Sequence, residues 1–140
     1  NPTITAAVVT GYLGVFLGSE TYTALVNAIL SLSAGPFFQA FIACNVLTFI
    51  TGSGTVAATP VFNAFKTPWL NSGVNIEALR PVMVASAAGA SISPHCGGLN
   101  GVLDYVGSDL RESYGPVFVA IVLNALLTSF VAAFAATLLF

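Results

Sequence analysis

Hydrophobic residues form long runs in this chain, and charged positions interrupt them at only a few places. In 140 residues there are three Lys and Arg and five Asp and Glu, so 6% of the chain is charged while 56% is hydrophobic. Residues 21–65, 81–103 and 113–140 carry no formal charge. Each stretch is longer than the roughly 20 residues that a helix needs to cross a bilayer. The pattern predicts an all-α integral membrane protein, with residues 1–140 forming one membrane domain.

The last of these stretches, residues 113–140, is the most uniformly apolar and predicts a C-terminal transmembrane helix. Pro116 suits the first turn of that helix, because the N–H that a proline lacks would be unpaired there in any case. Asn124, Thr128 and Ser129 recur at helical spacing. Small polar residues often join membrane helices, so this stripe indicates a packing face.

Residues 1–34 predict two short helices or one kinked transmembrane helix. Small residues mark the joint, namely Gly14, Gly18 and Ser19. The chain opens on Asn1 with no Met, and the charged start and cleavage site of a signal peptide do not occur. We therefore expect the chain to be a piece of a longer polypeptide.

Residues 35–65 consist of two apolar arms separated by a cluster of small and polar residues at 51–55, and the second arm contains Pro60. Each arm is only about half to three quarters of the length that crosses a bilayer. This pattern predicts a re-entrant helical hairpin with its tip at membrane depth, or one helix unwound at its centre. Either arrangement exposes backbone polar groups, which membranes tolerate only inside protein or beside a wet cavity.

Residues 78–106 repeat this design as a broken transmembrane helix. Pro94 removes a backbone donor and Gly97 and Gly98 loosen the chain, so we expect the helix to break there and to restart after Gly98. Two interrupted hydrophobic segments in one chain are typical of the substrate site of a secondary transporter.

The first break offers ligands for an ion at Gly52, Ser53, Gly54 and Thr55. Small residues expose backbone amides, and the helix that follows points its positive end at the cluster at 51–55. Both features favour an anion. The hydroxyls and unwound carbonyls suit a cation such as Na⁺ instead. A tight packing turn without a ligand is the structural alternative.

The second break contains His95, the one histidine of the chain, together with Ser93 and Gly97. An imidazole changes its charge near neutral pH, so in a cavity it can carry a proton or bind a carboxylate. The structural alternative is a neutral histidine that pairs with a carbonyl group. Asn45 and Asn100 are uncharged polar residues on the two broken segments, and we expect them to line the same cavity.

Other residues point to no further chemistry. Asp104 is expected at the membrane interface, and Asp109, Arg111 and Glu112 in a solvated loop. Cys44 and Cys96 lack the spacing of metal ligands and predict buried free thiols. We expect no metal, cofactor or catalytic residue. The net charge of −2 provides no basic surface for nucleic acid.

Two motifs resemble one family. The run Ser93–Leu123 is similar to the C-terminal part of the gluconate:proton symporter family, in which a Pro-His-small-Gly turn precedes a basic-Glu-Ser-Tyr segment. Here these are residues 94–97 and 111–114, and Asn45–Ala57 resembles the Gly-Ser-rich signature of the family. Where members commonly have an acidic residue a few positions before the Pro-His pair, this chain has Ser91.

This resemblance implies a proton-coupled symporter of gluconate or a similar small hydroxy-carboxylate, in the wider ion-transporter superfamily. It implies a multi-pass protein of the bacterial inner membrane, in which this chain is the second of two inverted repeats, the first lies in a missing N-terminal part, and the whole forms a homodimer. Ser53, Gly54 and Thr55 would form the hairpin tip, and Ser93 and His95 the broken helix, with His95 coupling the proton.

Three other functions are compatible with the same residues. One is a carboxylate transporter driven by sodium. A second is a channel or a structural membrane subunit, because broken helices also build selectivity filters. The third is an intramembrane serine protease with Ser53 as nucleophile and His95 as base, which requires the two side chains to lie within hydrogen-bond reach. We expect a transporter and not an enzyme.

Overall fold

The chain folds into helices throughout. The computed structural model describes residues 2–89 and 91–140; 82% of the chain is helical, and the described residues contain no strand. The prediction of an all-α fold is thus confirmed. In chain order the elements are α1 (Pro2–Leu17), α2 (Glu20–Leu30), α3 (Pro36–Thr51), α4 (Gly54–Asn71), α5 (Ile76–Gly89), α6 (Gly97–Val106), α7 (Leu110–Val117), a π-helical segment (Phe118–Leu123) and α8 (Asn124–Leu139).

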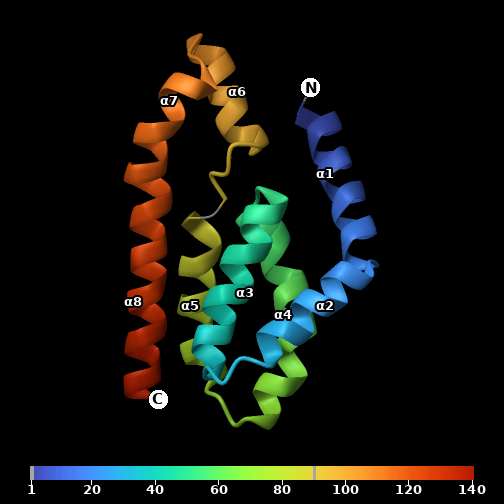
Figure 1. Cartoon of the computed structure of the whole chain (residues 1–140), viewed down its shortest axis with the longest axis vertical. Coiled ribbons are helices and arrows are strands. Elements are labelled where there is room, and N and C mark those ends of the chain that lie inside the picture. The colour runs from blue at the N-terminus through green and yellow to red at the C-terminus, as the bar shows by residue number, and fades with distance from the viewer. Residues whose placement is uncertain (1, 90) are drawn as a thin grey trace.

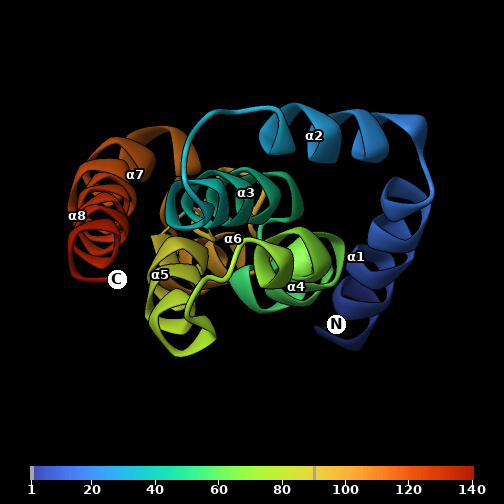
Figure 2. The ribbon, with the colours of Figure 1, turned by 90° about the horizontal axis from the view of Figure 1, so that it is seen from below.

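Helices α3, α4 and α5 pack together at the centre of the molecule, and α8 lies along α3 and α5 at one edge (Figures 1 and 2). Helices α3 and α5 run in one direction, and α4 and α8 run in the other (Figure 1). Ala40, Ala43 and Ala133 are fully buried in this core. Small side chains let helix backbones approach closely. Phe130 of α8 contacts the rings of Phe38 and Phe41 of α3 edge to face, with centroids 5.8 and 6.0 Å apart.

The N-terminal segment bends sharply between α1 and α2. The two helices are inclined by 63° at Gly18 and Ser19, within the joint expected from the sequence. The Ser19 hydroxyl accepts a hydrogen bond from the Tyr22 amide at 3.2 Å and donates one to the Phe16 carbonyl at 2.6 Å. One side chain therefore ends α1 and caps α2.

Helices α3 and α4 form the hairpin, and only two residues separate them. Gly52 ends α3 in the left-handed region at φ +66°, and its amide donates to the Thr48 carbonyl at 2.8 Å. Ser53 is extended and precedes α4. Glycine adopts a positive φ without the steric penalty of other residues, which explains why the chain can reverse here so tightly.

The second arm of the hairpin is longer than the sequence predicts. It was expected to end at residue 65, but α4 continues to Asn71. Phe65 and Trp69 are stacked and buried on one face of this extension. The Trp69 indole also donates to the Gln39 side chain of α3 at 3.2 Å. This burial keeps residues 66–71 helical, beyond the charge-free stretch that ends at residue 65.

Helices α5 and α6 lie on either side of the predicted break, and residues 91–96 between them are not helical. Helix α6 begins at Gly97, one residue before the Gly98 after which the restart was expected. Asn100 holds the break in shape, because its side-chain amide donates to the carbonyls of Pro94 and Cys96 at 3.1 and 3.0 Å.

The last helix runs without interruption from Leu110 to Leu139 and is long and apolar enough to cross a membrane. It begins three residues before the predicted start at 113, because Asp109 caps it by accepting from the Arg111 amide at 3.0 Å. Arg111 and Glu112, expected in a loop, therefore lie in its first turn. The π-helical segment begins at Phe118, two residues after Pro116, which lies inside α7 and not in the first turn of the helix as predicted. Proline lacks an amide donor and crowds the preceding turn, so we attribute the wider segment to it.

Candidate functional site

The hairpin tip and the helix break, which are about forty residues apart in the sequence, touch each other. A Cβ atom placed on Gly52 would lie 3.3 Å from Cδ2 of His95, 3.4 Å from Cα of Cys96 and 3.4 Å from the Ser93 hydroxyl. The structure thus brings together three of the residues expected to form the site, Gly52, Ser93 and His95. The two irregular segments form one surface.

Gly54 fixes the distance between the hairpin and α5. A Cβ atom on this residue would overlap the backbone of Ala87, lying only 2.8 Å from its carbonyl carbon. Real Cβ atoms essentially never come so close to a backbone atom. Only the hydrogen of a glycine fits, so the start of α4 lies directly on the backbone of α5.

The start of α4 carries hydrogen-bond donors that its own helix does not use. The amides of Gly54, Thr55 and Val56 belong to its first turn and have no intrahelical acceptor. The Ser53 side chain does not cap them; its hydroxyl pairs with the Thr55 hydroxyl at 3.2 Å. Free amides and the positive end of the helix dipole favour a negatively charged ligand at this point.

His95 links the break to the end of α3. Its Nε2 atom lies 3.2 Å from the Ile50 carbonyl oxygen and 3.3 Å from the Ser93 hydroxyl. Because a carbonyl oxygen only accepts, Nε2 must carry the proton in the first of these bonds. Nδ1 is then the atom that gains a further proton if the ring becomes charged. Phe49 contacts the ring edge to face, with centroids 6.0 Å apart.

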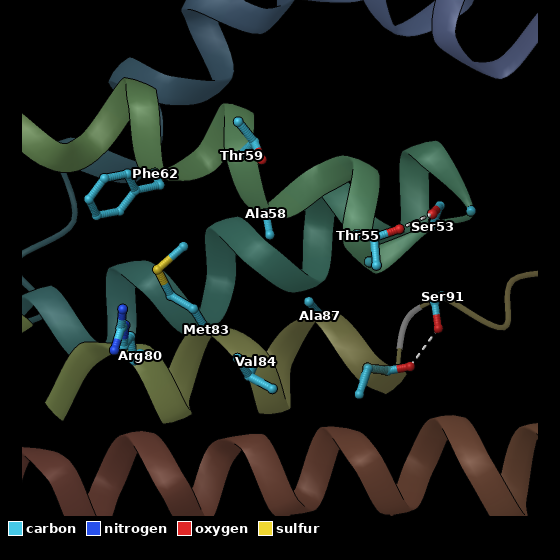
Figure 3. Close-up of a pocket in the computed structure, with 13 residues that line it drawn as sticks. Ser53, Thr55, Ala58, Thr59, Phe62, Arg80, Met83, Val84, Ala87 and Ser91 are labelled. Carbon is cyan, nitrogen blue, oxygen red and sulfur yellow. Dashed lines mark hydrogen bonds between the residues drawn. The ribbon is translucent and has the colours of Figure 1, made fainter. Parts of the chain in front are cut away.

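A cavity of about 710 Å³ lies between the first half of α4 and α5 (Figure 3). The hairpin tip forms one of its ends. Its lining residues are Gly52, Ser53, Gly54, Thr55, Ala58, Thr59, Phe62, Arg80, Met83, Val84, Ala87, Ala88 and Ser91. The four residues predicted for the hairpin tip therefore all line it.

The remaining predicted residues lie outside this lining. Ser93 is buried behind Gly52, and His95 and Gly97 are exposed at the break. Asn100 stabilises the break itself. Asn45 is buried in α3, where its amide donates to the Phe41 carbonyl at 2.9 Å and its oxygen has no partner among the described residues. Neither asparagine lines the cavity, in contrast to the expectation from the sequence.

Sequence reasoning missed the contribution of α5, above all Arg80. Its guanidinium lies 3.5 Å from the Glu77 carboxylate, and both side chains are exposed. A signal for this wall exists in the sequence, because Arg80, Val84, Ala87 and Ser91 recur at helical spacing and end in the break. That stripe was not recognised as a binding surface.

Two arrangements that other functions would use are not present among the described residues. Among residues 2–89 and 91–140, no three His, Cys, Asp or Glu side chains gather as metal ligands. The Ser53 hydroxyl pairs with the Thr55 hydroxyl, and the His95 ring pairs with the Ile50 carbonyl and the Ser93 hydroxyl. The Ser53 and His95 pair that a serine protease would use is therefore not formed.

Comparisons with models of protein families, with curated proteins and with solved structures find no match to this chain.

Proposed function

We propose that this chain belongs to a secondary active transporter that moves gluconate or a similar small carboxylate together with protons. The observation that carries the proposal is the contact between the hairpin tip and the helix break beside a cavity. Paired irregular segments of this kind, with a helix N-terminus facing the substrate, are the usual design of transporter sites. The motif resemblance to the gluconate:proton symporter family supports the same function.

The surface of the last helix supports a location in a bilayer. Only 17% of the most apolar window of Leu110–Leu139 is buried in the fold. A core helix of a soluble protein would be mostly buried. Leu127 and Leu138 are 59% and 71% exposed on α8, and large apolar surfaces of this kind mark contact with membranes or other proteins. We assign this surface to lipid.

In this proposal α3 and α4 form a re-entrant hairpin, α5 and α6 form a broken transmembrane helix, and the chain is one of two inverted repeats of a protein of the bacterial inner membrane. The proposal includes a homodimer, which rests on the resemblance alone. The carboxylate binds the free amides at the start of α4. His95 takes up the proton at Nδ1 while Nε2 keeps its bond to Ile50. Movement of the hairpin against the break then alternates access.

A charge in the middle of the last helix tests the membrane assignment. Leu127→Lys is expected to cost about 2.5 to 3.5 kcal/mol of insertion free energy, because a lysine near the centre of a spanning helix loses its water. The measurement is the fraction of protein that resists extraction from membranes at alkaline pH. Glu112→Lys, at the start of the same helix, is the matched control and should insert normally. Equal membrane fractions for both variants would contradict the assignment.

Uptake by vesicles tests the function. The full-length protein is reconstituted into liposomes, and entry of radiolabelled gluconate is followed with an inward proton gradient, with an inward sodium gradient and with neither. Saturable uptake that depends on the proton gradient is the expected result. Uptake driven only by sodium would support the carboxylate site but show that sodium, and not the proton, is the coupling ion. Unsaturable conductance would favour a channel.

A further inference from the structure

The cavity between α4 and α5 has two chemically different ends (Figure 3). Ser53 and Thr55 of the hairpin lie at one end, beside the free amides at the start of α4, and their hydroxyls pair with each other. Ser91 of the break lies at the same end, and its hydroxyl donates to the Ala88 carbonyl. Arg80 lies at the opposite end, near Phe62. Both ends therefore favour negatively charged or strongly polar groups, the first through hydrogen-bond donors and the second through a positive charge.

The wall between these ends is mostly apolar. Ala58 of α4 and Met83, Val84 and Ala87 of α5 form most of it, and Thr59 of α4 adds one hydroxyl group. Most hydroxyl groups of a bound sugar acid would lose water against this wall without gaining a hydrogen-bond partner, which is unfavourable. A plain carbon chain, in contrast, gains from burial there.

Arg80 has donors to spare for a ligand. Its contact with Glu77 is long at 3.5 Å, and the side chains are 75% and 80% exposed. Ion pairs of this type contribute little and are easily exchanged. A guanidinium presents five donors in a planar fork that matches a carboxylate. The residue thus suits a second carboxylate better than it suits a neutral group.

The spacing along α5 sets the size of the ligand. Ala87 lies against Gly54 of the hairpin. Arg80 lies seven residues before Ala87, which is about 10 Å along the helix axis. A compact anion at the hairpin tip would leave the Arg80 end of the cavity empty. A linear molecule with charged groups at both ends reaches both.

We propose that the cavity binds a linear dicarboxylate, with one carboxylate at the hairpin tip, the other at Arg80, and an unsubstituted carbon chain between them. This inference rests on the proposed function, which places the first carboxylate at the start of α4. Arg80 is then the residue that determines specificity for a second negative group, and an open-chain sugar acid is a weaker ligand.

The test compares three six-carbon acids by calorimetry on the full-length protein. Adipate carries two carboxylates, adipamate replaces one of them with an uncharged amide of the same shape, and gluconate adds hydroxyls. We expect adipate to bind roughly threefold to fivefold more tightly than adipamate, because Arg80 is exposed and exposed ion pairs contribute only modestly. Arg80→Gln should bring the two dissociation constants together while adipamate binding stays unchanged.

Lys66→Gln is the matched control, because Lys66 is an exposed cation on α4 that does not line the cavity. It should keep the preference for adipate. Should Arg80→Gln fail to fold, the comparison of adipate with adipamate on the unchanged protein still decides. Equal binding of these two acids, tighter binding of gluconate, or a preference that survives Arg80→Gln would overturn the inference. Absence of binding by all three acids would overturn the proposed function as well.

Discussion

Gly54→Ala is expected to disrupt the packing of the hairpin on α5 and to abolish carboxylate uptake. The added methyl group would overlap the carbonyl group of Ala87, which is backbone and cannot move aside as a flexible side chain would. Overpacking of this kind typically costs 1 to 3 kcal/mol, and we expect about 3 kcal/mol or more of unfolding free energy at this contact. Thermal unfolding in detergent and uptake by vesicles measure the two effects.

Gly101→Ala is the matched control for this prediction. Gly101 lies within α6, and nothing lies within 4 Å of a Cβ atom placed there. Alanine is a better helix former than glycine by about 1 kcal/mol, so this variant should be as stable as the parent or slightly more stable. Equal unfolding temperatures for Gly54→Ala and the parent protein would show that α4 does not lie against α5 as described.

His95→Gln is expected to separate proton coupling from the structural role of the histidine. A glutamine side chain can place an N–H where Nε2 of His95 lies and so keep the bond to the Ile50 carbonyl. It cannot take up a proton. We therefore expect a folded protein that exchanges labelled for unlabelled carboxylate but no longer accumulates it when a proton gradient is applied.

His95→Ala removes both the proton site and the bond between the break and α3. It should lose accumulation and also unfold at a lower temperature than His95→Gln. Accumulation by His95→Gln at the rate of the parent would exclude His95 from the coupling mechanism. Loss of exchange as well as accumulation in His95→Gln would instead make the histidine a structural residue.

The interruptions of the chain could be predicted from the sequence because each has a local cause. Gly18 and Ser19 coincide with the bend, Gly52 and Ser53 with the reversal, and the region of Pro94 with the break. Glycine and proline act on their own backbone, so their effect is visible in one segment. The predicted ends of the helices were less accurate, because capping and burial depend on neighbouring residues. Asp109 starts the last helix earlier than predicted, and the buried Trp69 extends α4.

The candidate site was predicted only in part, for a different physical reason. The hairpin tip was identified because its glycines and hydroxyls stand out in an apolar stretch. Arg80 was missed because it belongs to the site through the packing of α4 on α5, where Gly54 meets Ala87. The helical spacing of Arg80, Val84 and Ala87 shows that they share one face of α5, but it does not show which helix that face meets. Asn45 shows the converse, since a polar residue on a predicted site helix lies in the core.

Protection of a cysteine from alkylation tests most directly the claim that a carboxylate binds beside the hairpin tip. Thr55→Cys is made in a protein whose Cys44 and Cys96 are replaced by alanine, so that the new thiol in the cavity lining is the one that reacts within this chain. Saturating gluconate or adipate should slow its reaction with a maleimide severalfold, while Glu112→Cys, outside the cavity, should react at the same rate with and without the acid. An alkylation rate of Thr55→Cys that neither acid changes would contradict the account.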